Sequence, residues 1–220
     1  MITKMLAVST YKTIYMKSYH HGNLKEELIA CACRLCERDG YTKLSIRSLA
    51  KESGVSQTAP YRHFETKEAL YASVATNGFK KLSKACYIDT KKNVTKKQLV
   101  EIGCRYIEFG IENANTYDLM FGTAVRKFKD YPDLHEAANK TYDNMRSSFS
   151  ELAKESEDII AFKCLTLWSM VHGLVGIIRK VHEIGDDLEE NTDGPMMAGR
   201  MVADNLEQHL DKVISSLIQN

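Results

Sequence analysis

A short pattern between residues 44 and 56 constrains the fold of this 220-residue chain more than any other feature of its sequence. It reads Leu44-Ser45-x3-Leu49-Ala50-x3-Gly54-Val55-Ser56. Ser45 is a favourable helix N-cap, and Leu44 and Leu49 have the spacing of a hydrophobic staple. Gly54 permits the positive φ of a tight turn. The pattern therefore predicts two short helices that meet across a sharp turn, which is helix-turn-helix geometry.

The residues around this turn indicate which helix projects from the surface. Small Ala50 allows close approach of the two helices, Val55 fills the elbow, and Ser56 can cap the next helix. That next helix would be left projecting, with dimensions that suit a DNA major groove. The alternative is a helical corner that serves only for packing.

A longer helix is expected ahead of the turn. Asn23-Leu24-Lys25-Glu26 has the form of a capping box, and apolar residues recur with helical spacing at Leu24, Leu28, Ala32 and Leu35. Gly40 stands where a left-handed C-terminal cap is wanted. The first helix should span about residues 24–39.

Charge is distributed unevenly along the chain, although the net charge is only +1. Residues 1–84 carry a net charge of +7 and residues 85–220 a net charge of −6. A basic module joined to an acidic remainder indicates that the first part binds a polyanion and the second does not. The alternative is an uneven surface charge without a function.

Residues 19–82 resemble the N-terminal domain of the TetR family of transcriptional regulators. The resemblance is closest in Leu49-Ala50-Lys51-Glu52-Ser53-Gly54-Val55-Ser56 and in Ala59-Pro60-Tyr61-Arg62-His63-Phe64-Glu65-Thr66-Lys67-Glu68-Ala69-Leu70. It implies a recognition helix over residues 56–63. The DNA contacts that it implies are Ser56, Gln57, Thr58, Tyr61, His63 and Lys67. Arg47, near the start of the second helix, is a further candidate for a phosphate contact.

The roles implied for these residues differ. Gln57, Thr58 and Tyr61 would lie nearest the base edges or the DNA backbone. Tyr61, His63 and Lys67 would contact phosphates, with Lys67 at the start of a fourth helix, where the helix dipole also favours an anion.

Two aromatic residues and a proline complicate this assignment. Pro60 removes the first backbone hydrogen bond of a helix capped by Ser56, and it should pack with Val55 rather than read DNA. Phe64 is expected in the core. Tyr61 can be either a core residue or a DNA contact.

The remainder of the chain reads as a second helical domain, so the fold class is all-α. We divide the chain into an N-terminal extension (1–18), a helix-turn-helix domain (19–82) and a helical effector-binding and dimerisation domain (83–220). No alternating strand pattern is evident. The helices expected from the fourth onward span about residues 67–87, 95–114, 116–126, 131–153, 156–183 and 196–218.

The helices at 156–183 and 196–218 are too hydrophobic to stand alone in water. The family resemblance implies that they pair with their symmetry copies in a homodimer, which would bind a palindromic operator in double-stranded DNA. Gly173 and Gly176 would permit close helix approach. The stretch from Trp168 to Gly173, with His172, is similar to the Trp-His-Gly type of TetR C-terminal domain.

Adaptable apolar side chains in the second domain are candidates for an effector pocket, although they could equally form its core. Ordinary packing is also an alternative for Trp168 and His172. The effector expected from this composition is a small apolar or aromatic molecule. The candidate pocket residues are Cys104, Phe109, Met120, Phe121, Met145, Phe149, Trp168 and His172.

Several other classes of function lack support in the sequence. No stretch reaches the ~20 uninterrupted apolar residues of a membrane helix, and no export signal is evident, so we expect a cytoplasmic protein with free thiols. Cys31, Cys33 and Cys36 do not share a helix face as zinc ligands would, so no metal or cofactor is expected. Common catalytic motifs are missing, and His135-Glu136, His182-Glu183 and the acidic run at 186–190 read as solvated surface, so we do not expect an enzyme.

These observations predict a sequence-specific transcriptional regulator, and the family resemblance implies that it is a ligand-responsive repressor. The alternative is a ligand-independent DNA-binding dimer whose second domain binds a protein partner. Residues 1–18 have no place in the expected fold, and translation starting at Met16 would explain them. If the extension is present, its lysines would lie along the DNA backbone. The sequence does not identify the operator, the effector, the regulated genes or the sign of regulation.

Overall fold

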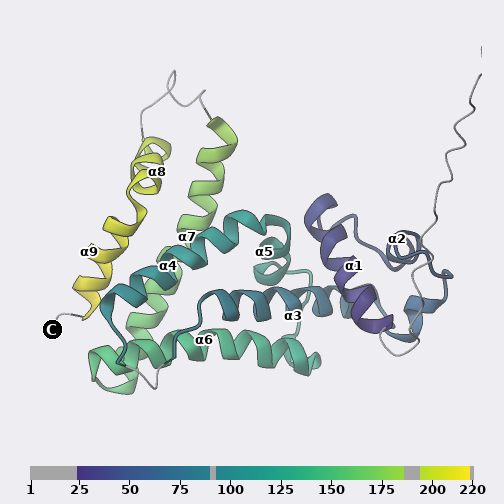
Figure 1. The fold of residues 1–220 in the computed structure, drawn as a ribbon, viewed down its shortest axis with the longest axis horizontal. Coiled ribbons are helices and arrows are strands. Elements are labelled where there is room, and N and C mark those ends of the chain that lie inside the picture. The colour runs from purple at the N-terminus through teal and green to yellow at the C-terminus, as the bar shows by residue number, and fades with distance from the viewer. Residues whose placement is uncertain (1–23, 90–92, 186–193, 219–220) are drawn as a thin grey trace, which may run out of the picture.

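The computed structural model describes residues 24–89, 93–185 and 194–218, and within these ranges every regular element is a helix (Figure 1). This confirms the all-α prediction. The N-terminal extension, the expected cap at Asn23 and the acidic run at 186–190 lie outside the described residues.

The first three elements form a small head at one end of the molecule. They are α1 (Leu24–Asp39), α2 (Ile46–Glu52) and the short 3₁₀ helix η1 (Ala59–Arg62). Ser45 caps α2 as predicted, since its side-chain oxygen accepts a hydrogen bond from the backbone N–H of Ser48 at 3.0 Å. Gly54 has a φ of +67°, which the tight turn requires.

The third helix of the head is shorter than predicted and is not α-helical. We expected an α-helix over residues 56–63 with Ser56 as its cap, but only residues 59–62 are helical, as a 3₁₀ turn. Proline at position 60 cannot donate a backbone hydrogen bond to Ser56, and it disfavours α conformation in the residue before it. Residues 56–58 therefore form a turn, in which the Ser56 hydroxyl lies 3.3 Å from that of Thr58.

The second part of the molecule is built around α3 (Lys67–Ala85), which begins beside the head and continues into the larger domain. It packs against α1, α4, α5 and α6, so it belongs to both parts of the core. The other elements are α4 (Lys96–Glu112), α5 (Ala114–Phe121), η2 (Phe128–Asp130), α6 (Pro132–Ala153), α7 (Glu157–Ile184), α8 (Pro195–Asp204) and α9 (Leu206–Ile218).

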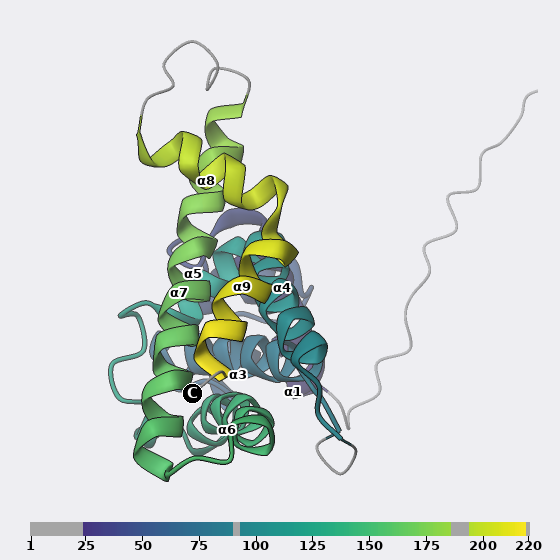
Figure 2. The same ribbon diagram turned by 90° about the vertical axis from the view of Figure 1, so that its left-hand side faces the viewer.

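Two of the predicted helices have different bounds. The helix expected at 116–126 ends at Phe121, because Gly122 is extended and cannot continue it. The single helix expected at 196–218 is two helices separated at Asn205. No proline or glycine breaks it: α8 packs on α7 while α9 packs on α4, and the two surfaces require a change of direction (Figure 2).

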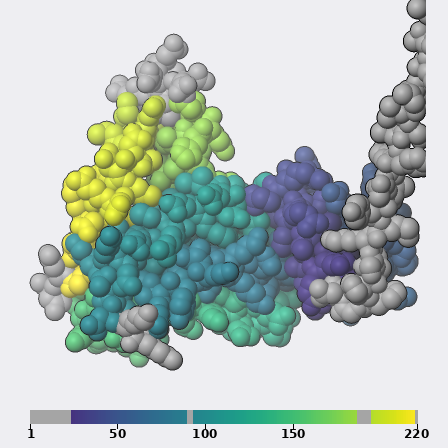
Figure 3. Space-filling model, viewed as in Figure 1, coloured from purple at the N-terminus to yellow at the C-terminus, as the bar shows by residue number. Residues whose placement is uncertain are grey.

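Helix α7 passes the length and composition criteria for a membrane-spanning helix. In its most apolar stretch 28% is buried within the molecule. One face of α7, including Val171 and Val175, packs against the core. The other face exposes Ile159, Phe162 and Leu165. In the space-filling view the α8–α9 region and the head lie at opposite ends of the molecule (Figure 3).

Candidate nucleic-acid interface and effector cavity

The side chains predicted to contact DNA lie on one small domain, and nearly all of them are exposed. Arg47 is on α2, residues 56–58 form the turn, and Lys67 begins α3. Tyr61 is 54% exposed, so its side chain is not a core residue. His63 is half-buried, which leaves less of its ring available to a ligand.

The backbone that presents these side chains is fixed from below. Pro60 and Phe64 are both buried, as predicted, and Pro60 O accepts hydrogen bonds from the N–H groups of His63 at 3.0 Å and Phe64 at 2.9 Å. Leu49 and Ala50 of α2 are also fully buried. The exposed groups of the turn and of η1 therefore stand on a packed base.

Lys67 occupies the predicted helix terminus, but its side chain already has partners. Thr66 caps α3 by accepting a hydrogen bond from Ala69 N at 3.0 Å. The Lys67 ammonium donates to Thr42 O at 3.3 Å and lies 5.2 Å from the centre of the Tyr71 ring. A phosphate would meet a lysine that is held against the loop between α1 and α2.

Sequence reasoning missed two exposed cations in this region. Arg62 belongs to the same 3₁₀ helix as Tyr61, and Lys43 lies in the loop that precedes α2. Both side chains are exposed. Both residues are close in sequence to predicted DNA contacts, which could have identified them. Arg62 and Lys43 enlarge the basic surface of the head.

The larger domain contains a cavity of about 350 Å³ enclosed chiefly by α3, α4, α5, α6 and α7. Its walls are aromatic and aliphatic and include no Asp, Glu, Lys or Arg side chain. A full charge placed inside would lose hydration without gaining a partner, which favours a neutral occupant. The lining residues are Phe79, Leu82, Cys86, Ile102, Tyr106, Met120, Phe121, Gly122, Phe128, Ala138, Asn139, Thr141, Tyr142, Met145 and Trp168.

The candidate pocket residues divide between the cavity and its surroundings. Met120, Phe121, Met145 and Trp168 line the cavity. His172 does not line it, but its ring packs against that of Phe121, with ring centres 4.9 Å apart.

The three remaining candidates lie elsewhere. Phe109 and Phe149 are buried core residues that do not reach the cavity. Cys104 lies near Glu207 of α9, and burial, together with nearby acidic groups, raises the pKa of its thiol. Helical periodicity identifies the apolar face of a helix, but it does not tell which neighbour that face meets. None of these three residues lines this cavity.

A row of hydrogen-bonded rings includes Trp168 and Tyr106 of the cavity wall and extends beyond it to two residues that do not line the cavity. Trp168 Nε1 donates to the Tyr106 hydroxyl at 3.0 Å, and that oxygen lies 3.0 Å from the Tyr117 hydroxyl. The Tyr117 hydroxyl in turn lies 2.6 Å from His172 Nδ1. Sequence reasoning missed both tyrosines, for which an aromatic residue with a polar tip within an apolar helix face was the only signal.

Burial controls the protonation of this row. It raises the pKa of Tyr106 to about 12 and also raises the pKa of Tyr117, so both hydroxyls stay protonated at neutral pH. Burial lowers the pKa of His172, which favours the neutral ring. In a neutral His172 one ring nitrogen carries a proton and the other accepts a hydrogen bond, so the tautomer sets whether Nδ1 or the Tyr117 hydroxyl is the donor.

The cysteines and other metal-ligating groups do not form a site in the described part of the chain. No cluster of three or more His, Cys, Asp or Glu side chains there could hold a metal ion. Cys31 and Cys36 are buried in the head core, and burial raises the pKa of Cys36 and that of the half-buried Cys33. These thiols pack as small apolar side chains.

Comparison with known families matches both parts of the chain. Residues 28–74 match the family of bacterial regulatory proteins named tetR, and residues 99–191 match the tetracyclin repressor-like C-terminal domain. Together the two matches cover more than half of the chain. The Trp-His-Gly assignment of the C-terminal part stays a prediction.

Three proteins of similar sequence or structure illustrate the comparison, and two of them are named as members of regulator families. An uncharacterized HTH-type transcriptional regulator of Bacillus subtilis, YerO, is 33% identical over 92 residues, which are 39% of this chain and 31% of that protein. A Rhodococcus structure of unknown function has a TM-score of 0.67 and 24% identity, covering 92% of this chain and all of that one. A TetR variant of Acinetobacter baumannii in complex with minocycline has a TM-score of 0.60 and 18% identity, covering 87% of this chain and 94% of that one.

Proposed function

The chain belongs to the TetR family of bacterial regulatory proteins, and on this premise we propose that it is a cytoplasmic, non-enzymatic repressor that binds a palindromic operator as a homodimer and is released by a small neutral ligand. One observation carries the proposal: a head with exposed basic and polar groups is joined by α3 to an apolar cavity. The first suits a nucleic acid and the second a small molecule.

The head is assigned to DNA binding by its charge and its exposed groups. Arg47 on α2, Arg62 on η1 and Lys67 on α3 are exposed, so phosphate contacts would supply sequence-independent affinity. Gln57 and Thr58 of that turn are exposed and have side chains able to read base edges. The 3₁₀ geometry of residues 59–62 places Tyr61 beside this turn.

The homodimer is assigned to the outer face of α7. Phe162 is 69% exposed and Leu165 is 51% exposed, which is unusual for large apolar side chains that have no partner. A Cβ added to Gly173 or Gly176 would meet no atom within 4 Å, so this face is also flat enough for close approach of a second helix. A second copy would cover it symmetrically and place two heads on one duplex.

The ligand is assigned to the cavity. Its size suits a small molecule, and its aromatic walls together with the absence of lining charges favour a neutral aromatic compound. Asn139 and Tyr142 of α6 offer hydrogen-bonding groups at its wall. Minocycline, bound by the A. baumannii TetR, is one example of a small molecule held by a protein of the same fold.

The test is a titration of duplex DNA selected from a genomic library. Lys67→Ala should lower the affinity for every duplex by a similar factor, because phosphate contacts carry no sequence information. Gln57→Ala should instead change the preferred base by about 1–3 kcal/mol at one position. Lys129→Ala, an exposed lysine on η2 outside the head, is the matched control and should behave like wild type. Wild type that binds no duplex at low ionic strength would refute the proposal.

A further inference from the structure

Helix α5 has no cap of its own at its N-terminus. Its N-cap residue, Asn113, makes no side-chain hydrogen bond to the first turn. Instead, Glu37 on α1 supplies the acceptors: Oε1 accepts from Asn115 N at 3.2 Å, while Oε2 accepts from Thr116 N at 3.1 Å and from the Thr116 hydroxyl at 2.8 Å. A residue of the head therefore caps a helix of the larger domain.

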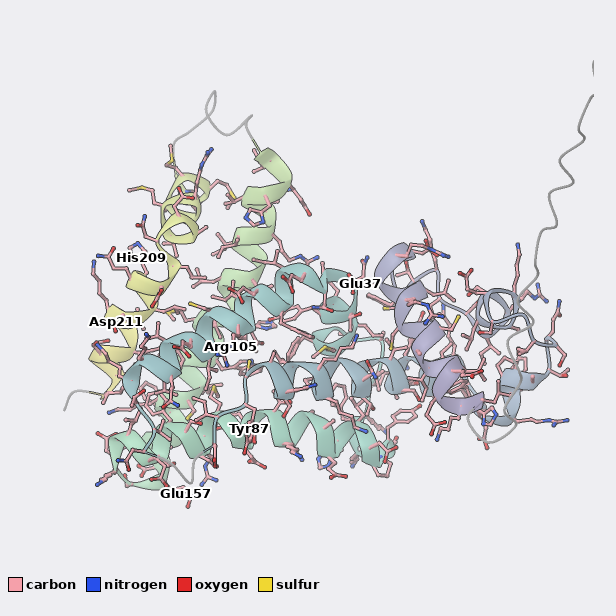
Figure 4. The ribbon with its side chains drawn as sticks, viewed as in Figure 1. Glu37, Tyr87, Arg105, Glu157, His209 and Asp211 are labelled. Atoms are coloured by element: carbon pink, nitrogen blue, oxygen red, sulfur yellow. The ribbon has the colours of Figure 1, made fainter. Side chains whose placement is uncertain are left out.

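Further contacts strengthen this junction. Asn115 Nδ2 donates to the backbone oxygen of Glu37 at 2.8 Å, so the contact is reciprocal. A carboxylate that accepts from N–H groups at a helix N-terminus forms charge-assisted bonds, which are stronger than neutral ones. Figure 4 shows Glu37 on the part of α1 that lies beside α5. The junction is thus a clamp that joins the head to the first turn of α5.

The middle of α5 is held by α7. Tyr117 lies 2.6 Å from His172, and Asp118 accepts two hydrogen bonds from Arg179, at 2.6 and 3.1 Å. These contacts join α5 to the helix that we assign to dimerisation. The short helix therefore lies between the head and α7 and contacts both.

The last turn of α5 forms part of the cavity. Met120, Phe121 and the following Gly122 line it. α5 has eight residues and spans only about 12 Å, so its cavity end and its clamped end lie close together. α5 also crosses α3 closely, since a Cβ added to Gly78 would lie 2.9 Å from a carbon of Thr116. A shift at the cavity end is then felt at the clamp.

We propose that Glu37 is the residue through which occupation of the cavity changes the position of the head. An occupant that displaces Met120 and Phe121 tilts α5 across α3, and Glu37 carries that displacement to α1. Glu37 is a positioning residue and touches neither DNA nor ligand. The biological meaning of this coupling rests on the proposed function, whereas the mechanical coupling is testable without DNA.

The proposal distinguishes Glu37 from the other connections of the head. α3 is continuous with both parts of the molecule, and Glu68 on α3 accepts a hydrogen bond from Arg126 N at 3.0 Å. Glu68 and Arg126 do not line the cavity, whereas Phe79 and Leu82 of α3 do, so α3 offers a path from the cavity to the start of α3 beside the head. The clamp at Glu37 is the path from α5 to α1. Removing the clamp should therefore leave the fold intact, because α3 still joins the two parts, and remove the transmission to α1.

The first test uses N-phenyl-1-naphthylamine, a neutral aromatic probe. Its binding is followed by energy transfer from Trp168, the single tryptophan of the chain and part of the cavity wall. Hydrogen exchange of the amides in residues 24–52 is measured with and without the probe. In wild type the exchange rates should change by several-fold on binding.

Glu37→Gln is the diagnostic variant, because its NH₂ group replaces one of the two accepting oxygens and would face a donor in either orientation, Asn115 N or the two donors of Thr116. It should bind the probe within about twofold of wild type, yet the probe should alter exchange in the head little or not at all. Glu27→Gln, an exposed glutamate on the same helix, is the matched control and should transmit like wild type. A Glu37→Gln protein that transmits the full change overturns the proposal.

A second arm fills the cavity without a ligand. Ala138→Phe places a ring inside the cavity from α6. Alone, this substitution should alter hydrogen exchange in residues 24–52; combined with Glu37→Gln, it should not. If neither the probe nor the filled cavity changes exchange in the wild-type head, no coupling exists and the proposal fails. Neither arm contains DNA, so this failure leaves the assignment of the head to DNA binding intact.

Discussion

The Tyr117 hydroxyl lies 2.6 Å from His172 Nδ1, so a hydrogen bond joins α5 to α7, and both rings pack against Phe121 of the cavity wall. The raised pKa of Tyr117 keeps its hydroxyl protonated, and the lowered pKa of His172 favours the neutral ring, which has one nitrogen free to accept a hydrogen bond. In the protonated His172 both ring nitrogens are donors, so the Tyr117 hydroxyl would have to be the acceptor in this contact. The contact is therefore sensitive to pH in its direction and in its strength.

This sensitivity predicts a loss of stability in mild acid. Because the His172 pKa is lower in the folded state than its ordinary 6.5, the unfolded state binds the proton more readily. The contribution of neutral His172 to the free energy of unfolding is complete above about pH 6.5, and it decreases as the pH falls towards the pKa of His172 in the folded state. Urea unfolding at pH 7 and pH 5 should show a larger loss for wild type than for His172→Gln.

The control for this pH dependence is His182→Gln, since His182 is exposed on the same helix. It should lose as much stability as wild type between the two pH values. An equal loss in wild type and His172→Gln would contradict the assignment.

The exposed face of α7 predicts a dimer that a single charge can dissociate. Phe162→Glu should weaken self-association by about 100-fold or more, because an unpaired charge buried in an interface costs about 3 kcal/mol. Analytical ultracentrifugation over a range of concentrations measures the dissociation constant. Tyr87→Glu is the matched control, because Tyr87 is 58% exposed and lies outside α7–α9. Wild type that stays monomeric at micromolar concentration would contradict the dimer.

The turn of the head predicts a small and purely conformational cost. Gly54 has a φ of +67°, and a Cβ added there would meet no atom within 4 Å. Gly54→Ala should therefore lower the free energy of unfolding by about 1–2 kcal/mol through backbone strain alone. Urea unfolding tests this, with Gly54→Asn as the comparison, since asparagine tolerates this region and should cost less. An alanine variant as stable as wild type would show that the turn relaxes.

Local sequence signals predicted most of the helices, because caps and apolar periodicity act over a few residues. Ser45, Gly40 and Gly54 occupy the expected positions, and the bounds of α1 agree with the prediction. The prediction was wrong for the recognition helix, where Pro60 restricts α conformation to a short 3₁₀ turn. That restriction was visible in the sequence, but its effect was underestimated.

Contacts between distant segments were beyond such signals. Asn205 carries no strong signal to break a helix, yet the chain turns there because α8 and α9 pack on different neighbours. The cavity wall likewise includes Phe79 and Phe128, which are far apart in the sequence and whose ring centres lie 6.1 Å apart. Only the packing of several helices brings them together.

Local periodicity, helix caps and residue order were enough to predict the all-α class, the basic helix-turn-helix module and the family from the amino-acid sequence. Three features depend on how the helices pack against one another. These are the set of apolar side chains that line the cavity, the face of α7 that stays exposed, and the capping of α5 by Glu37. Helical spacing defines a face, but the neighbour of that face is chosen by the packing of the whole core.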